Sequence, residues 1–116
     1  LFPPPFSVGI SGDWAVTGAL LHGADVWYSV LGGILPKICM QIVTAARQGN
    51  GGEAQQLNGL LEPMWALFRQ FSGLRVVYAL ADLLGLSEAA PPRPLLPVPE
   101  SAKRQIADVL RSLPAE

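Results

Sequence analysis

Apolar residues in the first third of the chain form two short runs separated by a helical pattern. Residues 6–10, FSVGI, are apolar and bounded by turn residues, which is typical of a strand buried on both faces. Residues 24–30, ADVWYSV, are rich in β-branched and aromatic side chains and predict a second strand. The intervening residues 14–21 have helical spacing, and Ser11 or Asp13 is placed to cap that helix. The pattern predicts a β-α-β unit.

Apolar residues recur at helical spacing through most of the remaining chain. Pro36 opens one helix, whose apolar stripe ends near Ala46. Further helices are expected at about 53–71 and 74–85. Residues 86–99 contain too many prolines for a regular element and predict an extended strap over the surface. A last amphipathic helix follows this strap.

The composition is unusually apolar for a chain of 116 residues. Apolar residues make up 50% and charged residues 15%, whereas an average protein has about 25% charged residues. The mean hydropathy is +0.34. Only two strands are predicted, and a ribbon of two parallel strands leaves both of its edges unpaired. We therefore expect this chain, which begins with Leu1, to be the C-terminal part of a larger α/β protein.

Charge and residue counts argue against several kinds of site. The net charge is −1 and the basic residues are scattered, so nucleic acid is not an expected partner. The sequence has no run of about 20 apolar residues that predicts a membrane helix, and its start does not resemble a signal peptide. Cys39, the single cysteine, lies on an apolar helix face, which favours a buried, inert thiol in a cytoplasmic protein. His22 is the single histidine, so no zinc site is expected.

Several short motifs occur in an order that resembles one enzyme family. SGDW ends the first strand, and HGADVWYSVLGGILP covers the second strand and the turn after it. AARQGNGGEAQQLNGLLEPMWALF, ALADLLGL and RPLLPVPESAKRQIADVL then follow. This ordered series resembles the C-terminal part of the dihydrodipicolinate synthase / N-acetylneuraminate lyase family, and the resemblance covers essentially the whole chain.

The resemblance implies an α/β fold, the C-terminal portion of a (β/α)8 TIM barrel with a helical extension. Residues 1–48 would supply the last two βα units, and residues 49–116 the helical region that carries the proline-rich strap 86–99. The family chemistry is that of a class I aldolase, in which a lysine forms a Schiff base with pyruvate or another 2-oxo acid. That lysine and a proton-transferring tyrosine would precede Leu1, so we expect no catalytic residue, no cofactor and no metal site in this chain.

The resemblance also implies partners and leaves other interpretations open. The expected partners are the remainder of the barrel, a small 2-oxo acid, an aldehyde and further copies of the chain, because the family usually forms tetramers. The sequence VWYS replaces the family's G-x-[IV]-S and places bulky side chains beside the pocket, so the substrate pair stays open. A non-catalytic helical interaction module and a degenerate barrel that binds 2-oxo acids are the alternative functions.

Five residues at the carboxyl ends of the two predicted strands are expected to contact substrate, because TIM-barrel sites lie at these strand ends. They are Ser11, Gly12, Asp13, Tyr28 and Ser29. By the resemblance, Gly12 brings its backbone close to the bound oxo acid, and Ser29 matches a family serine. Two structural alternatives stay open: Asp13 could cap a helix, and Tyr28 could fill the barrel interior.

Overall fold

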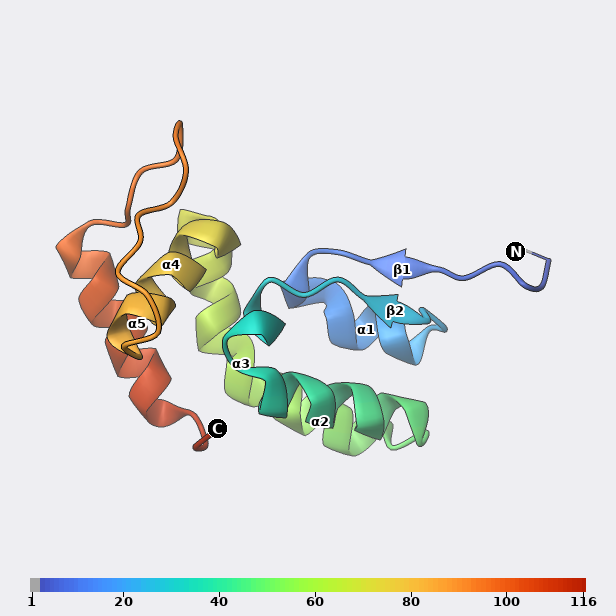
Figure 1. Ribbon diagram of the computed structural model, residues 1–116. Helices are drawn as coiled ribbons and strands as arrows, with labels where there is room; N and C mark the ends of the chain where they lie inside the picture. The colour runs from blue at the N-terminus through green and yellow to red at the C-terminus, as the bar shows by residue number, and fades with distance from the viewer. Residues whose placement is uncertain (1–2) are drawn as a thin grey trace.

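The strands and helices occur in the order that the sequence predicts (Figure 1). A computed structural model describes residues 3–116. Two short strands lie at one end of a group of helices, and the N-terminal segment extends beyond them. The elements are β1 (Gly9–Ile10), the 3-10 helix η1 (Asp13–Ala15), α1 (Val16–Leu21), β2 (Val26–Trp27), the 3-10 helix η2 (Leu31–Gly33), α2 (Pro36–Arg47), α3 (Gly51–Phe71), α4 (Gly73–Leu83) and α5 (Glu100–Ser112).

β1 and β2 form a parallel ladder that is shorter than the sequence predicts. Each strand has two residues, and Gly9 pairs with Val26 while Ile10 pairs with Trp27. The Tyr28 N–H donates to the Ile10 carbonyl oxygen at 3.0 Å and continues the ladder by one bond. Within residues 3–116, no third strand pairs with either edge.

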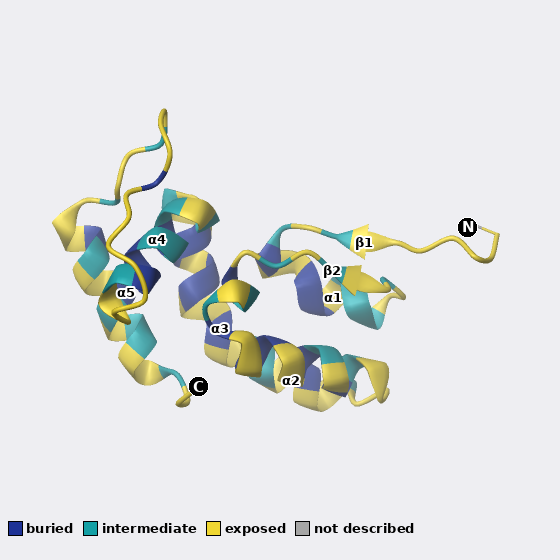
Figure 2. Ribbon diagram, in the orientation of Figure 1, coloured by how far each residue is buried: buried dark blue, intermediate teal, exposed yellow. Residues whose placement is uncertain are grey.

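The prediction that the first strand is buried on both faces is wrong for the described chain, and much of the second strand is exposed as well. Val8, Val26 and Tyr28 are exposed, and Figure 2 shows much of the ribbon in the exposed colour. Strands are held in regular pairing by neighbours on both edges and by burial of at least one face. Since residues 3–116 supply neither edge neighbour, the regular ladder ends after two residues on each strand.

The four longer helices confirm the predicted helical segments. α3 begins at Gly51, two residues before the expected start, because Asn50 caps it. The Asn50 side-chain oxygen accepts the Glu53 N–H at 3.2 Å, and the Asn50 amide donates to the Glu53 carboxylate at 2.7 Å. Within residues 3–116, no helix combines the length and the apolar character needed to span a bilayer.

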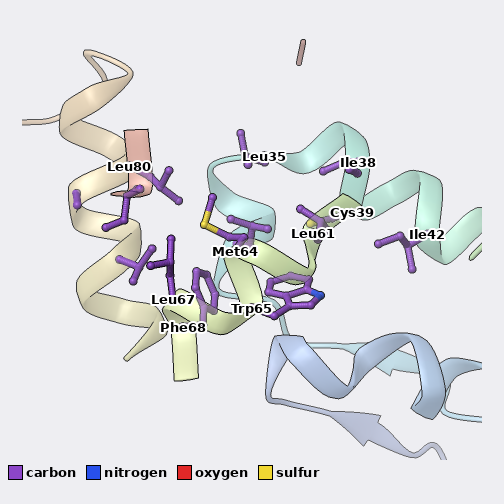
Figure 3. Packing of buried hydrophobic residues seen from close by; sticks show 14 residues of the cluster. Leu35, Ile38, Cys39, Ile42, Leu61, Met64, Trp65, Leu67, Phe68 and Leu80 are labelled. Atoms are coloured by element: carbon purple, nitrogen blue, oxygen red, sulfur yellow. The ribbon is translucent and has the colours of Figure 1, made fainter. Parts of the chain in front are cut away.

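The helices enclose one hydrophobic cluster, shown in Figure 3. Trp65 and Phe68 belong to it, with their ring centroids 5.4 Å apart in an edge-to-face arrangement. The members come from η2, α2, α3, α4 and α5, so the core contains residues from both sides of the expected boundary after residue 48. The buried members are Leu31, Leu35, Ile38, Cys39, Ile42, Leu61, Met64, Trp65, Leu67, Phe68, Val76, Ala79, Leu80 and Ile106.

A half-buried asparagine joins the β-α-β unit to this helical core. The Asn58 side-chain oxygen on α3 accepts the Thr17 hydroxyl of α1 at 3.0 Å and the Trp65 indole N–H at 3.1 Å. Thr17 is buried, so its hydroxyl requires a partner inside the protein. α1 is thereby held against α3 even though the ribbon beside it is largely exposed.

The proline-rich strap 86–99 has no regular secondary structure, as the sequence predicts. In Figure 1 its first part projects as an orange loop beyond α4. Its return is held by Arg75 of α4, which donates to the Leu96 carbonyl oxygen at 2.7 Å and to the Pro97 carbonyl oxygen at 3.1 Å. These bonds satisfy backbone acceptors that proline-rich chain cannot pair by itself.

Replacement of Leu61 by alanine tests whether the helical cluster carries the stability of the chain. Leu61 is fully buried on α3, and its neighbour Leu60 is 44% exposed. We expect Leu61→Ala to lower the free energy of unfolding by about 2–5 kcal/mol, because it leaves a cavity. The matched control Leu60→Ala makes the same chemical change at the surface. Urea unfolding measures both, and equal losses in the two variants would contradict this core.

Candidate functional site

The two loops that leave the carboxyl ends of β1 and β2 lie side by side. β1 and β2 are parallel and paired in register, so the chain segments that follow them emerge at the same edge. Gly12 has a φ of +94°, a left-handed conformation that glycine adopts without strain, and it turns the chain from β1 into η1. The structure therefore brings together the loop that contains Ser11, Gly12 and Asp13 and the loop that contains Tyr28 and Ser29.

Asp13 is a buried carboxylate that binds the second loop. It is 1% exposed. It accepts hydrogen bonds from the Trp27 indole N–H at 3.0 Å and from the Ser29 hydroxyl at 3.1 Å. The backbone N–H groups of Val30 and Leu31 donate to it at 3.1 and 2.8 Å. Four donors from residues 27–31 thus bind the two carboxylate oxygens of Asp13.

The prediction that Ser11 or Asp13 caps the helix after β1 is wrong. The residues at the N-caps of η1 and α1 are Gly12 and Ala15, and neither makes a side-chain capping bond. Asp13 instead accepts the N–H groups at the start of η2, which follows the other strand. Ser11 is exposed.

Ser29 is held between Asp13 and the backbone of η2. Its hydroxyl donates to Asp13 Oδ2 and accepts the Gly32 N–H at 2.7 Å. A Cβ atom at Gly32 would lie 3.1 Å from the Ser29 oxygen, so a side chain there would crowd this bond.

Tyr28 points away from Asp13, although the residues on both sides of it are bound to that carboxylate. Its ring lies over Gly9, where an added Cβ would come within 2.6 Å of Tyr28 Cε2. The side chain is 66% exposed in this chain. Alternate residues of a strand point to opposite faces, so Trp27 and Ser29 face the helices and Tyr28 faces the uncovered side of the ribbon.

Cys39 of α2 belongs to the hydrophobic cluster and is hydrogen-bonded to Ser29. Burial raises the pKa of its thiol to about 12, and the negative charge of Asp13 acts in the same direction, while a hydrogen bond with Ser29 lowers it. The prediction of a buried thiol is confirmed, and the raised pKa leaves little thiolate for nucleophilic chemistry. Among residues 3–116, no three His, Cys, Asp or Glu side chains are grouped as a metal site would require.

A cleft of about 320 Å³ runs between β2 and α2. It is bounded by strand and loop residues on one side and by the exposed face of α2 on the other. Its lining includes Val26, Trp27, Ser29, Cys39, Met40 and Val43. The cleft is mostly apolar and lies along β2, whose free edge no strand in residues 3–116 occupies.

Sequence reasoning missed the donors that surround Asp13. The Trp27 indole and the backbone N–H groups of Val30 and Leu31 lie 14 to 18 residues from Asp13 in the chain. One local signal was present. Ser29 precedes Gly32 by three residues, which is the spacing at which a serine accepts a backbone N–H at the start of a helix. The contact between the two loops had no local signal.

Comparison with protein families gives a match over most of the chain. Residues 6–113 match the model of the dihydrodipicolinate synthetase family. A 4-hydroxy-tetrahydrodipicolinate synthase of Rickettsia rickettsii is 30% identical over 109 residues, and one of Rickettsia typhi is 32% identical over 109 residues. Each alignment covers 93% of this chain and 37% of the relative. The chain therefore spans little more than a third of the length of these relatives.

Solved structures contain the same arrangement of elements. The dihydrodipicolinate synthase of Agrobacterium tumefaciens str. C58 superposes with a TM-score of 0.94 at 42% identity, over 97% of this chain and 38% of that chain. The dihydrodipicolinate synthase of Bacteroides thetaiotaomicron superposes with a TM-score of 0.82 at 18% identity, over 95% of this chain and 39% of that chain. The second likeness shows the fold alone. The α/β fold is thus that of part of a barrel protein.

Alkylation of Cys39 by iodoacetamide tests the burial of this region. At about pH 8.5 we expect the folded chain to react roughly a hundredfold more slowly than the chain in urea, because its thiol stays protonated. The raised pKa of the Cys39 thiol also predicts how the stability of the folded chain depends on pH. Relative to a Cys39→Ala variant, the folded chain should lose stability as the pH rises from 9.0 toward about 12, since only the unfolded thiol ionises there. Equal alkylation rates in the folded and unfolded chains would contradict this placement.

Proposed function

Because this chain belongs to the dihydrodipicolinate synthetase family, we propose that it is the C-terminal part of a lyase or aldolase that forms a Schiff base with pyruvate or another 2-oxo acid. Residues 1–48 supply the last two βα units of a TIM barrel, and residues 49–116 form its helical extension. The chemistry belongs to the whole protein. This chain matches 37% of the length of the Rickettsia rickettsii relative.

One observation carries the proposal, namely the incomplete pairing of the ribbon. β1 and β2 have no further strand on either edge within residues 3–116, and apolar side chains such as Val8 and Val26 are exposed beside them. The remainder of a barrel would pair both edges and cover these side chains. The apolar cleft along β2 is a second surface that an adjoining βα unit would fill.

The lysines in this chain do not suit the role of the Schiff-base nucleophile. A lysine becomes nucleophilic near neutral pH when burial lowers the pKa of its amine. Lys37 is exposed at the start of α2. Lys103 is paired with Asp82, and this hydrogen bond raises the pKa of its amine, which is the opposite direction. We therefore assign the Schiff base to a lysine from the preceding part of the barrel.

The expected substrate contacts divide into two groups by geometry. Tyr28 directs its side chain to the uncovered side of the ribbon, where a barrel interior would lie. In the loop after β1, Gly12 is half-buried and Ser11 is exposed. Asp13 and Ser29 bind each other and the start of η2. In our proposal the first group faces the 2-oxo acid and its aldehyde partner, and the second group supports the loops. Assembly into a homo-oligomer follows the family expectation.

A non-catalytic interaction module is the second candidate function. It is favoured by the hydrophobic cluster of η2 and α2 to α5, whose buried members include no residue of β1 or β2, although Trp27 of β2 packs against it. A helical module of this kind would use the ribbon only to pair with another chain. A degenerate barrel that binds 2-oxo acids without turnover differs from the proposed enzyme in lacking the upstream lysine.

Reductive trapping tests the proposed chemistry. The full-length protein is incubated with pyruvate and sodium borohydride, which converts a Schiff base into a stable secondary amine. We expect a mass increase of one reduced pyruvate per chain, on a lysine that precedes Leu1.

The 116-residue chain, treated in the same way, is the control and should gain no mass. An adduct on Lys37 or Lys103 would contradict the assignment of the nucleophile. Absence of any adduct in the full-length protein would leave the fold in place and favour the interaction module.

A further inference from the structure

We infer that Asp13 is a positioning residue for the substrate pocket, and this inference rests on the proposed function. Its carboxylate fixes the two loops at the carboxyl ends of β1 and β2 relative to each other. It thereby sets the direction of Tyr28, which faces the uncovered side of the ribbon, and the place of the adjoining Gly12 backbone. Asp13 itself is buried and turned toward the helices, so it acts through these neighbours.

The position of Tyr28 depends on the bonds of the residues that flank it. Trp27 donates its indole N–H to Asp13 Oδ1 at 3.0 Å, and Ser29 donates its hydroxyl to Asp13 Oδ2 at 3.1 Å. Because these two side chains are drawn to one side of the strand, the side chain between them must leave on the other side. The Tyr28 ring then lies over Gly9, where the missing Cβ leaves room for it.

The turn after Tyr28 depends on the same carboxylate. Val30 and Leu31 donate their backbone N–H groups to Asp13, and Ser29 accepts the N–H of Gly32. Within residues 3–116, each side-chain hydrogen bond to the start of η2 therefore involves Asp13 or a residue bound to it. A shift of Asp13 would move the whole segment from Trp27 to Gly32.

Asp13 also fixes Gly12, which immediately precedes it. Gly12 has a φ of +94° and no side chain to anchor it. The four donors that hold Asp13 are then the fixed points that locate the Gly12 peptide relative to the second loop. In a pocket that depends on the approach of this backbone to an oxo acid, a misplacement of about 1 Å costs on the order of a hundredfold in rate.

The hydrogen-bond inventory requires a carboxylate at this position. All four partners are donors, and an ionised aspartate offers only acceptors. An asparagine of the same size replaces one oxygen with an NH₂ group, which would face an N–H or O–H donor whichever way the amide is turned. Asp13→Asn thus keeps the volume and removes the match.

The test compares Asp13→Asn with Asp25→Asn in the full-length protein. Asp25 is also an aspartate that accepts a backbone N–H of the ribbon, from Val8 at 2.9 Å, but it lies at the amino end of the ladder, away from the two loops. A third variant, Trp27→Phe, removes one donor and keeps an aromatic ring, so it serves if Asp13→Asn does not fold.

Three quantities are measured for each variant. They are the fraction of chains trapped by borohydride at saturating pyruvate, the KM for pyruvate in the trapping reaction, and the trapping rate per competent chain. For Asp13→Asn we expect the rate per competent chain divided by KM to fall about tenfold or more, and for Trp27→Phe a smaller fall in the same direction. Asp25→Asn should leave KM and the rate per competent chain unchanged.

A merely structural role for Asp13 predicts a different result. It would lower the fraction of competent chains and leave KM and the rate per competent chain at their parental values. That outcome for Asp13→Asn, or for Trp27→Phe where Asp13→Asn does not fold, would overturn the positioning role while parental trapping upholds the proposed function. If the parent protein itself forms no adduct, the proposed function fails and the positioning role fails with it.

Discussion

Backbone hydrogen bonding along a parallel ribbon is the constraint on which the rest of this structure depends. A strand that enters a protein interior must pair its N–H and C=O groups on both edges, and a two-stranded parallel ribbon pairs only one edge of each strand. β1 and β2 contact each other over two residue pairs, and their outer edges meet no strand in residues 3–116. The short ladder follows from these unpaired edges, and the exposed aromatic and aliphatic side chains follow from the uncovered face of the ribbon.

The helical part of the chain buries its own apolar side chains. Two sets of hydrogen bonds fix the ribbon and its loops relative to these helices. Asn58 joins α1 to α3, and Asp13 joins the loop after β1 to the loop after β2. Asp13 is buried and Asn58 half-buried, and each accepts at least one hydrogen bond from another element, so each is costly to leave unpaired and specific in geometry. The candidate site is therefore held from the helix side, while the other side of the ribbon is open in this chain.

The sequence predicted the helices well because each carries its own pattern. The apolar stripe of α2 and that of α3 can be read without knowledge of any other element. The two-residue error at the start of α3 came from overlooking Asn50 and Glu53 as a capping pair. Strand length could not be predicted in this way, because it depends on neighbours outside the two apolar runs. The role of Asp13 was hidden for a similar reason, since its donors are brought to it only by the pairing of β1 with β2.

Hydrogen exchange tests the central claim most directly. The backbone N–H groups of residues 8–10 and 26–30 are compared in the 116-residue chain and in the full-length protein, with the buried N–H groups of α3 as internal reference. The account predicts that exchange of the ribbon N–H groups slows by about a hundredfold or more in the full-length protein, while those of α3 change little. Equal protection of the ribbon in both proteins would contradict the claim that its missing neighbours come from the rest of a barrel.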